Sequence, residues 1–117
     1  YTVILTTTGS AGSAADSEVT EHIQGWFLDA YLDYHASAPA TTDVTIKQTG
    51  HADNILLVSD NATDGRYAPR QALVSRAAAA ITNSHDLIPV NGTLTVSAAQ
   101  SDALTAAVTV TIRVLTF

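Results

Sequence analysis

The stretch IQGWFLDAYLDYH, residues 23–35, constrains the fold most strongly, because it is the most apolar part of the chain and its apolar side chains recur at alternate positions. Successive residues of a β-strand point to opposite faces of a sheet. On that reading one face is apolar, with Trp26, Leu28, Ala30, Leu32 and Tyr34, and the other is mixed, with Phe27, Asp29, Tyr31, Asp33 and His35. The stretch is therefore predicted to be a long strand with one buried side and one mixed side.

The same stretch also fits an amphipathic helix, because six of its residues recur at helical spacing. They are Ile23, Trp26, Phe27, Ala30, Tyr31 and Tyr34. A helix would leave Leu28 and Leu32 among the carboxylates, and would hold Gly25 in its interior at a cost of about 1 kcal/mol relative to Ala. Aromatic residues also suit a pleated, half-buried surface. The strand is the preferred prediction, and a partly helical segment within residues 17–35 stays open.

Other stretches rich in β-branched or apolar residues predict further strands, at residues 2–8, 43–49, 54–60, 66–75, 87–100 and 105–117. The last two are separated by about five residues and are expected to pair as a hairpin. Residues 76–86 include four successive Ala, which predicts a turn or a single helical turn. Residues 1–117 are thus predicted to form a single all-β domain. We expect an antiparallel, jelly-roll-like β-sandwich of six to seven strands with at most one short helix.

Composition limits the classes of partner. Eleven acidic and five basic residues give a net charge of −6, which disfavours nucleic acid and anionic membrane surfaces. No apolar run approaches the roughly 20 residues of a membrane span. The opening residues, YTVILTTT, lack a basic segment, so no signal peptide is expected. Because the chain has no Cys, it has no disulfide framework and no thiolate metal site.

The carboxylates and histidines show no convergent catalytic pattern. Asp29 and Asp33 share a strand face but stand roughly 13 Å apart along it, beyond the about 5–10 Å that glycoside hydrolysis uses. We expect them to be solvated or to pair with Arg side chains. The histidines lack metal-ligand spacing and are expected at the surface; they are His22, His35, His51 and His85.

The stretch DNATDG, residues 60–65, partly resembles a calcium-binding loop. Ala62 occupies its third position, and Gln71 stands at the twelfth, where such loops carry Glu. A turn explains the stretch without a metal, and calcium binding stays open.

Arg66, Arg70 and Arg76 form the only cluster of positive charge, suited to an acidic partner or to ion pairs within the chain. The one enzymatic alternative would require a pocket that unites His35, Asp33 and Arg70. The chain has no GxSxG-type nucleophile motif and no phosphate-binding loop. We therefore expect no enzyme, and we assign no catalytic, cofactor-binding or metal-binding residue and no cofactor.

Three stretches carry a resemblance to a known group of proteins: DAYLDYHASAPATTDVTI (29–46), RYAPR (66–70) and PVNGTLTVSAAQSDALTAAVTVTIRV (89–114), about half of the chain. In their Ala- and Thr-rich texture they resemble small Cys-free β-proteins of tailed bacteriophage virions, including head-decoration (cement) proteins. The resemblance implies a β-sandwich that binds a capsid or its own copies, and it supplies no catalytic residues.

We therefore expect a virion structural protein, made in the bacterial host cytoplasm, that decorates a tailed-phage head. Expected partners are the major capsid protein or another virion protein, and copies of the chain itself, with a trimer as one arrangement. Thr-rich strands can extend a neighbour's sheet, so contacts are expected from the N-terminal strand, residues 9–14 and the C-terminal strand. The alternative is a carbohydrate-binding or adhesion module, with Trp26 and the Tyr residues as a stacking platform.

Overall fold

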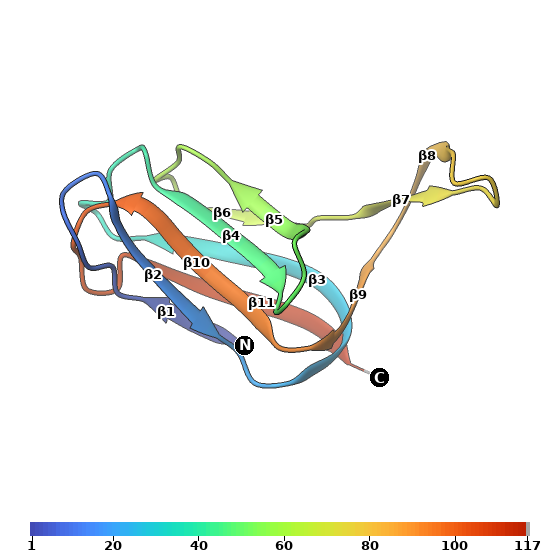
Figure 1. The fold of residues 1–117 in the computed structure, drawn as a ribbon, viewed down its shortest axis with the longest axis horizontal. Helices are drawn as coiled ribbons and strands as arrows, with labels where there is room; N and C mark the ends of the chain where they lie inside the picture. The colour runs from blue at the N-terminus through green and yellow to red at the C-terminus, as the bar shows by residue number, and fades with distance from the viewer. Residues whose placement is uncertain (117) are drawn as a thin grey trace.

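The computed structural model describes residues 1–116 and shows two antiparallel sheets packed face to face, with a hairpin that projects from one end (Figure 1). One sheet has the order β1 (Thr2–Leu5), β11 (Val108–Thr116), β3 (Ile23–Tyr34) and β6 (Gly65–Tyr67), and β9 (Ile88–Gly92) also pairs with β3. The other has the order β2 (Ala14–Val19), β10 (Leu94–Ser101), β4 (Asp43–Gln48) and β5 (Asn54–Val58). The projecting hairpin consists of β7 (Gln71–Val74) and β8 (Ala80–Asp86). Within residues 1–116 there is no helix of the length and apolarity that crossing a membrane requires.

The prediction of an all-β antiparallel sandwich is confirmed, but residues 1–116 form eleven strands where six to seven were expected. Two predicted strands are each divided. Residues 66–75 contribute to β6 and β7, which are separated around Pro69, a residue without the N–H that a ladder needs. Residues 87–100 contribute to β9 and β10, which are separated after Gly92, whose φ is +149°. Phe117, the last residue of the predicted C-terminal strand, lies outside the described residues.

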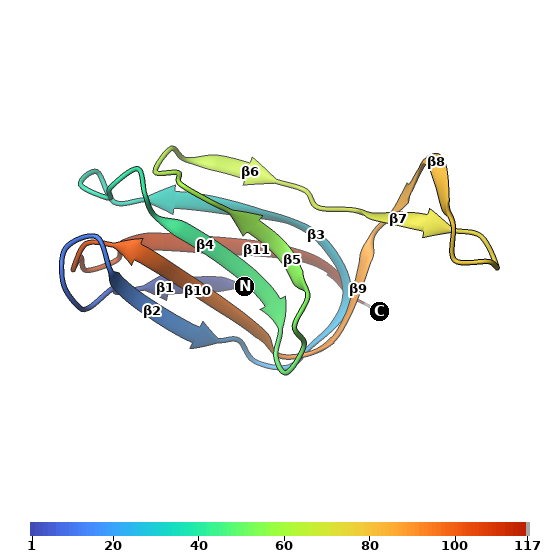
Figure 2. The same cartoon turned by 45° about the horizontal axis from the view of Figure 1, so that its top comes forward.

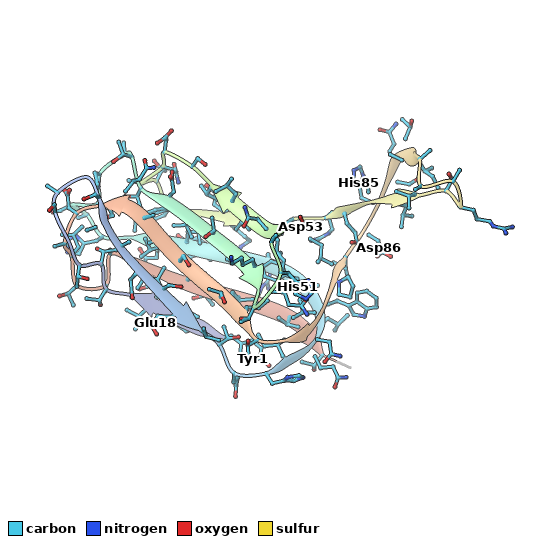
Figure 3. The ribbon with its side chains drawn as sticks, in the orientation of Figure 1. Tyr1, Glu18, His51, Asp53, His85 and Asp86 are labelled. Carbon is cyan, nitrogen blue, oxygen red and sulfur yellow. The ribbon has the colours of Figure 1, made fainter. Side chains whose placement is uncertain are left out.

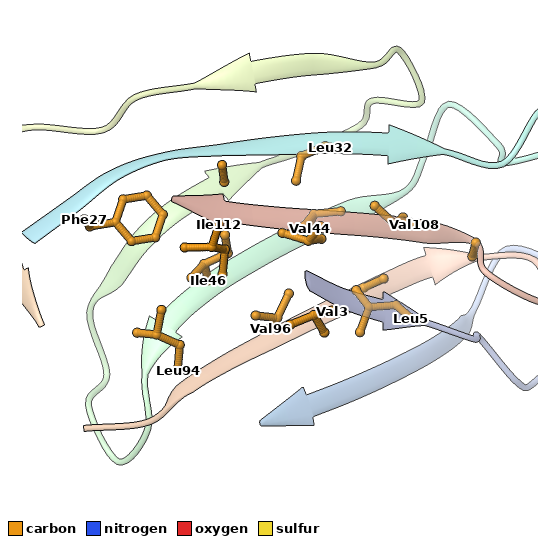
Figure 4. Close-up of a cluster of buried hydrophobic side chains, with 14 of the residues drawn as sticks. Val3, Leu5, Phe27, Leu32, Val44, Ile46, Leu94, Val96, Val108 and Ile112 are labelled. Carbon is orange, nitrogen blue, oxygen red and sulfur yellow. The ribbon is translucent and has the colours of Figure 1, made fainter. Parts of the chain in front are cut away.

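The core fills the space between the inner faces of the two sheets (Figure 4). Its side chains come from alternate positions of the paired strands, as strand geometry requires. The largest fully buried ones include Phe27, Leu32, Ile112, Val108, Val44, Ile46, Leu94 and Val96. Full burial of one such side chain contributes about 1.5–3 kcal/mol, so this cluster supplies much of the drive to fold.

A β-bulge in β3 changes which of its residues face the core. Arg113 of β11 pairs with Asp29 and the next residue, Val114, pairs with Phe27, so that Leu28 has no partner in this ladder. The inward positions before the bulge therefore have the opposite parity from those after it. Ala30, Leu32 and Tyr34 are buried as predicted, whereas Trp26 and Leu28 are partly exposed and Phe27 is completely buried. The predicted buried face is thus correct after the bulge and wrong before it.

The predicted hairpin between the last two strands is wrong, because β10 and β11 lie in opposite sheets. Each has two neighbours in its own sheet: β2 and β4 flank β10, while β1 and β3 flank β11. The connection between them is tied to the N-terminal segment, since Thr7 Oγ1 donates to Asp102 O at 2.5 Å and accepts from Leu104 N at 3.2 Å. A short linker therefore crosses from one sheet to the other.

Both segments that were open to a helical reading lack a helix. Residues 14–19 and 23–34 are strands, and Ser17 of the first bonds Ser97 of β10 through their hydroxyl groups at 3.0 Å. The Ala run 77–80 lies in the tight turn of the projecting hairpin and at the start of β8. Strand pairing overrides local helix propensity here, because a single helical turn has no stability of its own.

Candidate functional site

The hairpin of residues 71–86, called the arm below, projects clear of the sandwich along its longest dimension (Figure 2). The molecule measures 48 × 28 × 23 Å along its principal axes. None of the arm's side chains is buried, and three of its large apolar residues are exposed, Leu73 to 40%, Val74 to 57% and Ile81 to 45%. A two-stranded hairpin without a hydrophobic face to pack on is only marginally stable. The arm is therefore an element with apolar surface and no core.

The shape of the arm comes from a tight turn and a bulge. Ser75 N donates to Ala79 O and Ala78 N donates to Ser75 O, which closes the tip around Ala78 at a φ of +60°. Ala72 pairs with His85 but Val74 pairs with Ala80, so β8 carries three extra residues between these pairs. Asn83 lies among them with a φ of +60°, a conformation that Asn tolerates better than most residues. These features bend β8 away from a flat hairpin (Figure 2).

The arm leaves the sandwich at the bulge of β3. β6 pairs with β3 at residues 30–32 and β9 pairs with it at residues 23–27, so both lie along one edge of β3 with a gap between them. Arg70 bridges this gap, because its Nη1 donates to Leu28 O at 2.9 Å and to Pro69 O at 2.8 Å. The bulge thus leaves a carbonyl that anchors the base of the arm.

A hollow of about 420 Å³ lies at the base of the arm, between the β4–β5 turn and the start of β7. Its walls include His51 and Asp53 from the turn and Arg70 and Gln71 from the arm side. Figure 3 shows His51 and Asp53 at the end of the sandwich that faces the arm, to the left of His85 and Asp86 of β8. Within residues 1–116 no group of three or more His, Asp or Glu is placed to hold a metal ion.

The opposite side of the sandwich has an open edge, formed by β1 of one sheet and β2 of the other. At one end the segment that follows β1 is bridged to β2, since Thr8 and Ala15 exchange both main-chain hydrogen bonds, at 3.1 and 3.0 Å. At the other end they separate around a groove of about 380 Å³, called the edge groove below, lined by residues 1–4 and 18–21. Ile4 is 56% exposed and Val19 is 58% exposed beside it.

The edge groove combines apolar surface with negative charge. Tyr1, Ile4 and Val19 are exposed apolar side chains, and Glu18 and Glu21 are the charged side chains of its lining. β1 pairs only with β11 and β2 only with β10 among the described strands, so each presents one unpaired main-chain edge. Such edges are a ready surface for another chain.

The outer face of the first sheet carries the ion pairs of the described residues. The Asp29 carboxylate accepts from Arg113 Nε at 2.8 Å and from Arg113 Nη2, and from Arg66 Nη1 at 3.3 Å. These two guanidinium groups, Arg113 first, hold the pKa of Asp29 below its ordinary value against the opposing effect of burial. The Arg66 guanidinium also lies 5.5 Å from the centre of the Tyr31 ring. The expectation that Asp29 pairs with Arg is confirmed, while Asp33 is exposed.

The structure does not unite the residues of the enzymatic alternative. Arg70 bonds Leu28 O, whereas Asp33 lies five residues further along β3, roughly 16 Å away at 3.3 Å per residue. His35 follows the end of β3, and its Nδ1 accepts from Ser37 N at 3.0 Å. The predicted basic cluster is also dispersed, because Arg66 lies on β6, Arg70 at the base of the arm and Arg76 at its tip.

The DNATDG stretch forms the connection from β5 to β6, and its side chains bond the protein itself. Asp64 Oδ1 accepts from Tyr34 N at 2.7 Å, and Asn61 Nδ2 donates to Thr63 O at 2.9 Å. Asp60 has a φ of +50°, and its N–H donates to Asp43 Oδ1 at 2.9 Å. These contacts are those of an anchored turn. The predicted surface histidines are exposed: His22, His35, His51 and His85.

Sequence reasoning missed the arm as a site, and it predicted contacts from the N-terminal strand without the groove beside that strand. Residues 71–75 of the arm were predicted as part of a strand and residues 76–86 as a turn or a single helical turn, and the available signal for a projecting arm was a low content of large apolar residues between Pro69 and Pro89. The groove depends on two strands that are adjacent only in the folded chain. No protein-family model matches the chain, and no curated protein matches it.

Proposed function

We propose that the chain is a structural subunit of a virion, a decoration (cement) protein on the head of a tailed bacteriophage. The observation that carries this proposal is the arm, sixteen residues without a buried side chain that include the exposed apolar residues Leu73, Val74 and Ile81. Such a hairpin gains little from its own fold. Contact with another protein would remove its apolar surface from water, and each buried Å² of that surface contributes about 25 cal/mol.

The resemblance to virion proteins suggests that the protein contacted by the arm is part of a phage capsid. The open edge of the sandwich offers a second surface for contact. The expected partners remain the major capsid protein or another virion protein, and copies of the chain itself. On a symmetric shell each contact is repeated many times, so contacts that are weak singly become strong together. The arm therefore suits a protein that acts as one of many copies.

The test is co-assembly with shells formed by the major capsid protein encoded in the same genome. Purified chain is added to preformed shells, which are then sedimented and imaged by electron microscopy. We expect saturable co-sedimentation, with added density at regularly repeated positions of the shell. A chain concentration of about 100 μM lies well above the dissociation constants of ordinary specific contacts. Shells that remain bare at this concentration would refute the proposal.

A carbohydrate-binding or adhesion module is the second candidate, and the observation in its favour is the partial exposure of Trp26. The rest of the aromatic platform is not assembled, since Tyr34 is buried and the Tyr31 ring lies beneath Arg66. Titration with a panel of oligosaccharides tests this candidate through Trp26 fluorescence. A shift in emission that saturates supports it, and unchanged emission throughout the panel counts against it.

A further inference from the structure

We infer that the arm of one copy docks in the edge groove of a second copy of this chain. The inference rests on the proposed assembly function and names the contact between subunits. Both surfaces expose large apolar side chains to water. On the arm they are Leu73, Val74 and Ile81, and at the groove they are Tyr1, Ile4 and Val19. Contact between them would cover apolar surface on both copies.

The arm cannot fill the groove of its own chain. It leaves the sandwich beside β3 and β9, whereas the groove lies between β1 and β2, and Figures 1 and 2 show the arm directed away from both strands. Figure 3 likewise places His85 and Asp86 far from Tyr1 and Glu18. Because the donor and acceptor surfaces differ, two copies can make the contact reciprocally in a two-fold dimer, or successive copies can make it head to tail in a ring or an open chain.

The charges of the two surfaces are complementary. Arg76 stands at the tip of the arm, makes no ion pair among residues 1–116, and is the only Lys or Arg of residues 71–86. Glu18 and Glu21 line the groove, which has no Lys or Arg in its lining. The amino group of Tyr1, also at the groove, donates to Ile112 O at 2.9 Å. In a chain of net charge −6, an Arg placed against two carboxylates favours this one contact over random association.

The main chain adds a second source of attraction. The unpaired edges of β1 and β2 can accept a further strand, and the arm offers strands whose outer edges are themselves unpaired among the described elements. Sheet extension of this kind gains main-chain hydrogen bonds, while side chains set the specificity. The arm is therefore suited both in shape and in chemistry to an edge position.

The test is the self-association of the full chain, measured by sedimentation velocity at low salt without any capsid. We expect species larger than the 12.2 kDa monomer. Arg76→Glu, and separately the pair Glu18→Arg with Glu21→Arg, should each weaken association by about tenfold or more, because both put like charges together. The triple variant should recover association, because it exchanges the charges across the contact.

Two control substitutions change charge elsewhere on the molecule. Lys47→Glu matches Arg76→Glu, and Asp33→Lys tests the opposite change on an exposed carboxylate. Both should leave association unchanged, and circular dichroism should show native sheet in every variant, since no substituted residue is buried. A monomeric wild type at about 100 μM, or a triple variant that associates no better than its parents, would overturn the inference.

The two proposals fail separately. A wild-type chain that stays monomeric yet binds shells through its arm overturns the contact between copies and leaves the decoration function intact. A chain that associates through arm and groove but ignores shells supports the contact and overturns the decoration function.

Discussion

Substitution of Phe27 and Leu28 in turn tests the bulge that sets the faces of β3. Phe27 is completely buried, so Phe27→Ala removes a ring from the core and should cost about 3–5 kcal/mol. Leu28 is only partly buried, and Leu28→Ala should cost about 1 kcal/mol, near half of the value of a fully buried Leu. Without the bulge, strict alternation would exchange the two costs. Leu32, fully buried after the bulge, is the reference, at about 2–5 kcal/mol for Leu32→Ala.

These free energies translate into large differences in melting temperature. A chain of 117 residues has an unfolding entropy of about 0.25 kcal/mol/K near 60 °C, so Phe27→Ala should lower Tm by about 12–20 °C. Leu28→Ala should lower it by about 4 °C. Circular dichroism followed through thermal and urea unfolding provides both Tm and the free energy of unfolding, and an unchanged urea slope would show that the unfolded states are comparable. A Leu28→Ala variant less stable than Phe27→Ala would refute the bulged register.

Three further predictions concern other parts of the molecule. Because the pKa of Asp29 is lowered in the folded state, its ionised form stabilises the protein above pH about 4, and this contribution is lost as the pH falls through the folded pKa. Arg113→Leu should therefore lower the urea midpoint at pH 7, and this difference from wild type should narrow as the pH falls below about 4; a difference that widens in acid would contradict this. Gly25→Ala should cost about 1–3 kcal/mol in chemical unfolding, because its Cβ would lie 2.3 Å from Leu115 O, whereas Gly12→Ala, with φ +79° and open space, should cost only about 1 kcal/mol; equal costs would argue against the close approach. Replacing residues 72–85 by Asn-Gly between Gln71 and Asp86 should change the calorimetric Tm by less than about 2 °C, because the arm buries no side chain, and a loss above about 8 °C would show that the arm belongs to the core.

The alternation of residues was sufficient to predict the class of fold, but not the face of every residue. The strands predicted at 43–49 and 105–117 do bury alternate residues, because they run without interruption through their buried parts, and these residues are Val44, Ile46, Val108, Val110 and Ile112. The bulge at Leu28 was invisible, because Trp26, Phe27 and Leu28 are all large and apolar and fit either parity. Which of them is buried depends on pairing with β11, a strand about 80 residues away.

Pairing between distant segments also explains the other errors. The six-residue connection after β10, residues 102–107, is compatible with a hairpin or with a crossing between sheets. The pairing of β10 with β2 and of β11 with β1 places the two strands in different sheets. The Ala run before β8 has helix propensity, but a strand-and-turn arrangement satisfies its backbone through Ser75 and Ala79. Local sequence included the turn among its predictions for the Ala run, but it did not decide between turn and helical turn or between hairpin and crossing.

The edge groove and the arm, the two surfaces on which the proposed contacts depend, were likewise only partly predictable from the sequence. The sequence did predict that the N-terminal strand would be an interaction surface, since β-branched residues without charge favour an edge that another chain can approach. It could not reveal that Glu18 and Glu21 lie beside that strand, because β1 and β2 are the edge strands of two different sheets and come together only in the folded protein. Nor could it reveal that Arg76 stands at the tip of a projecting arm, where it makes no ion pair with a carboxylate of residues 1–116. This unpaired cation on the arm and the acidic open edge of the sandwich are the two features from which we infer the contact between copies.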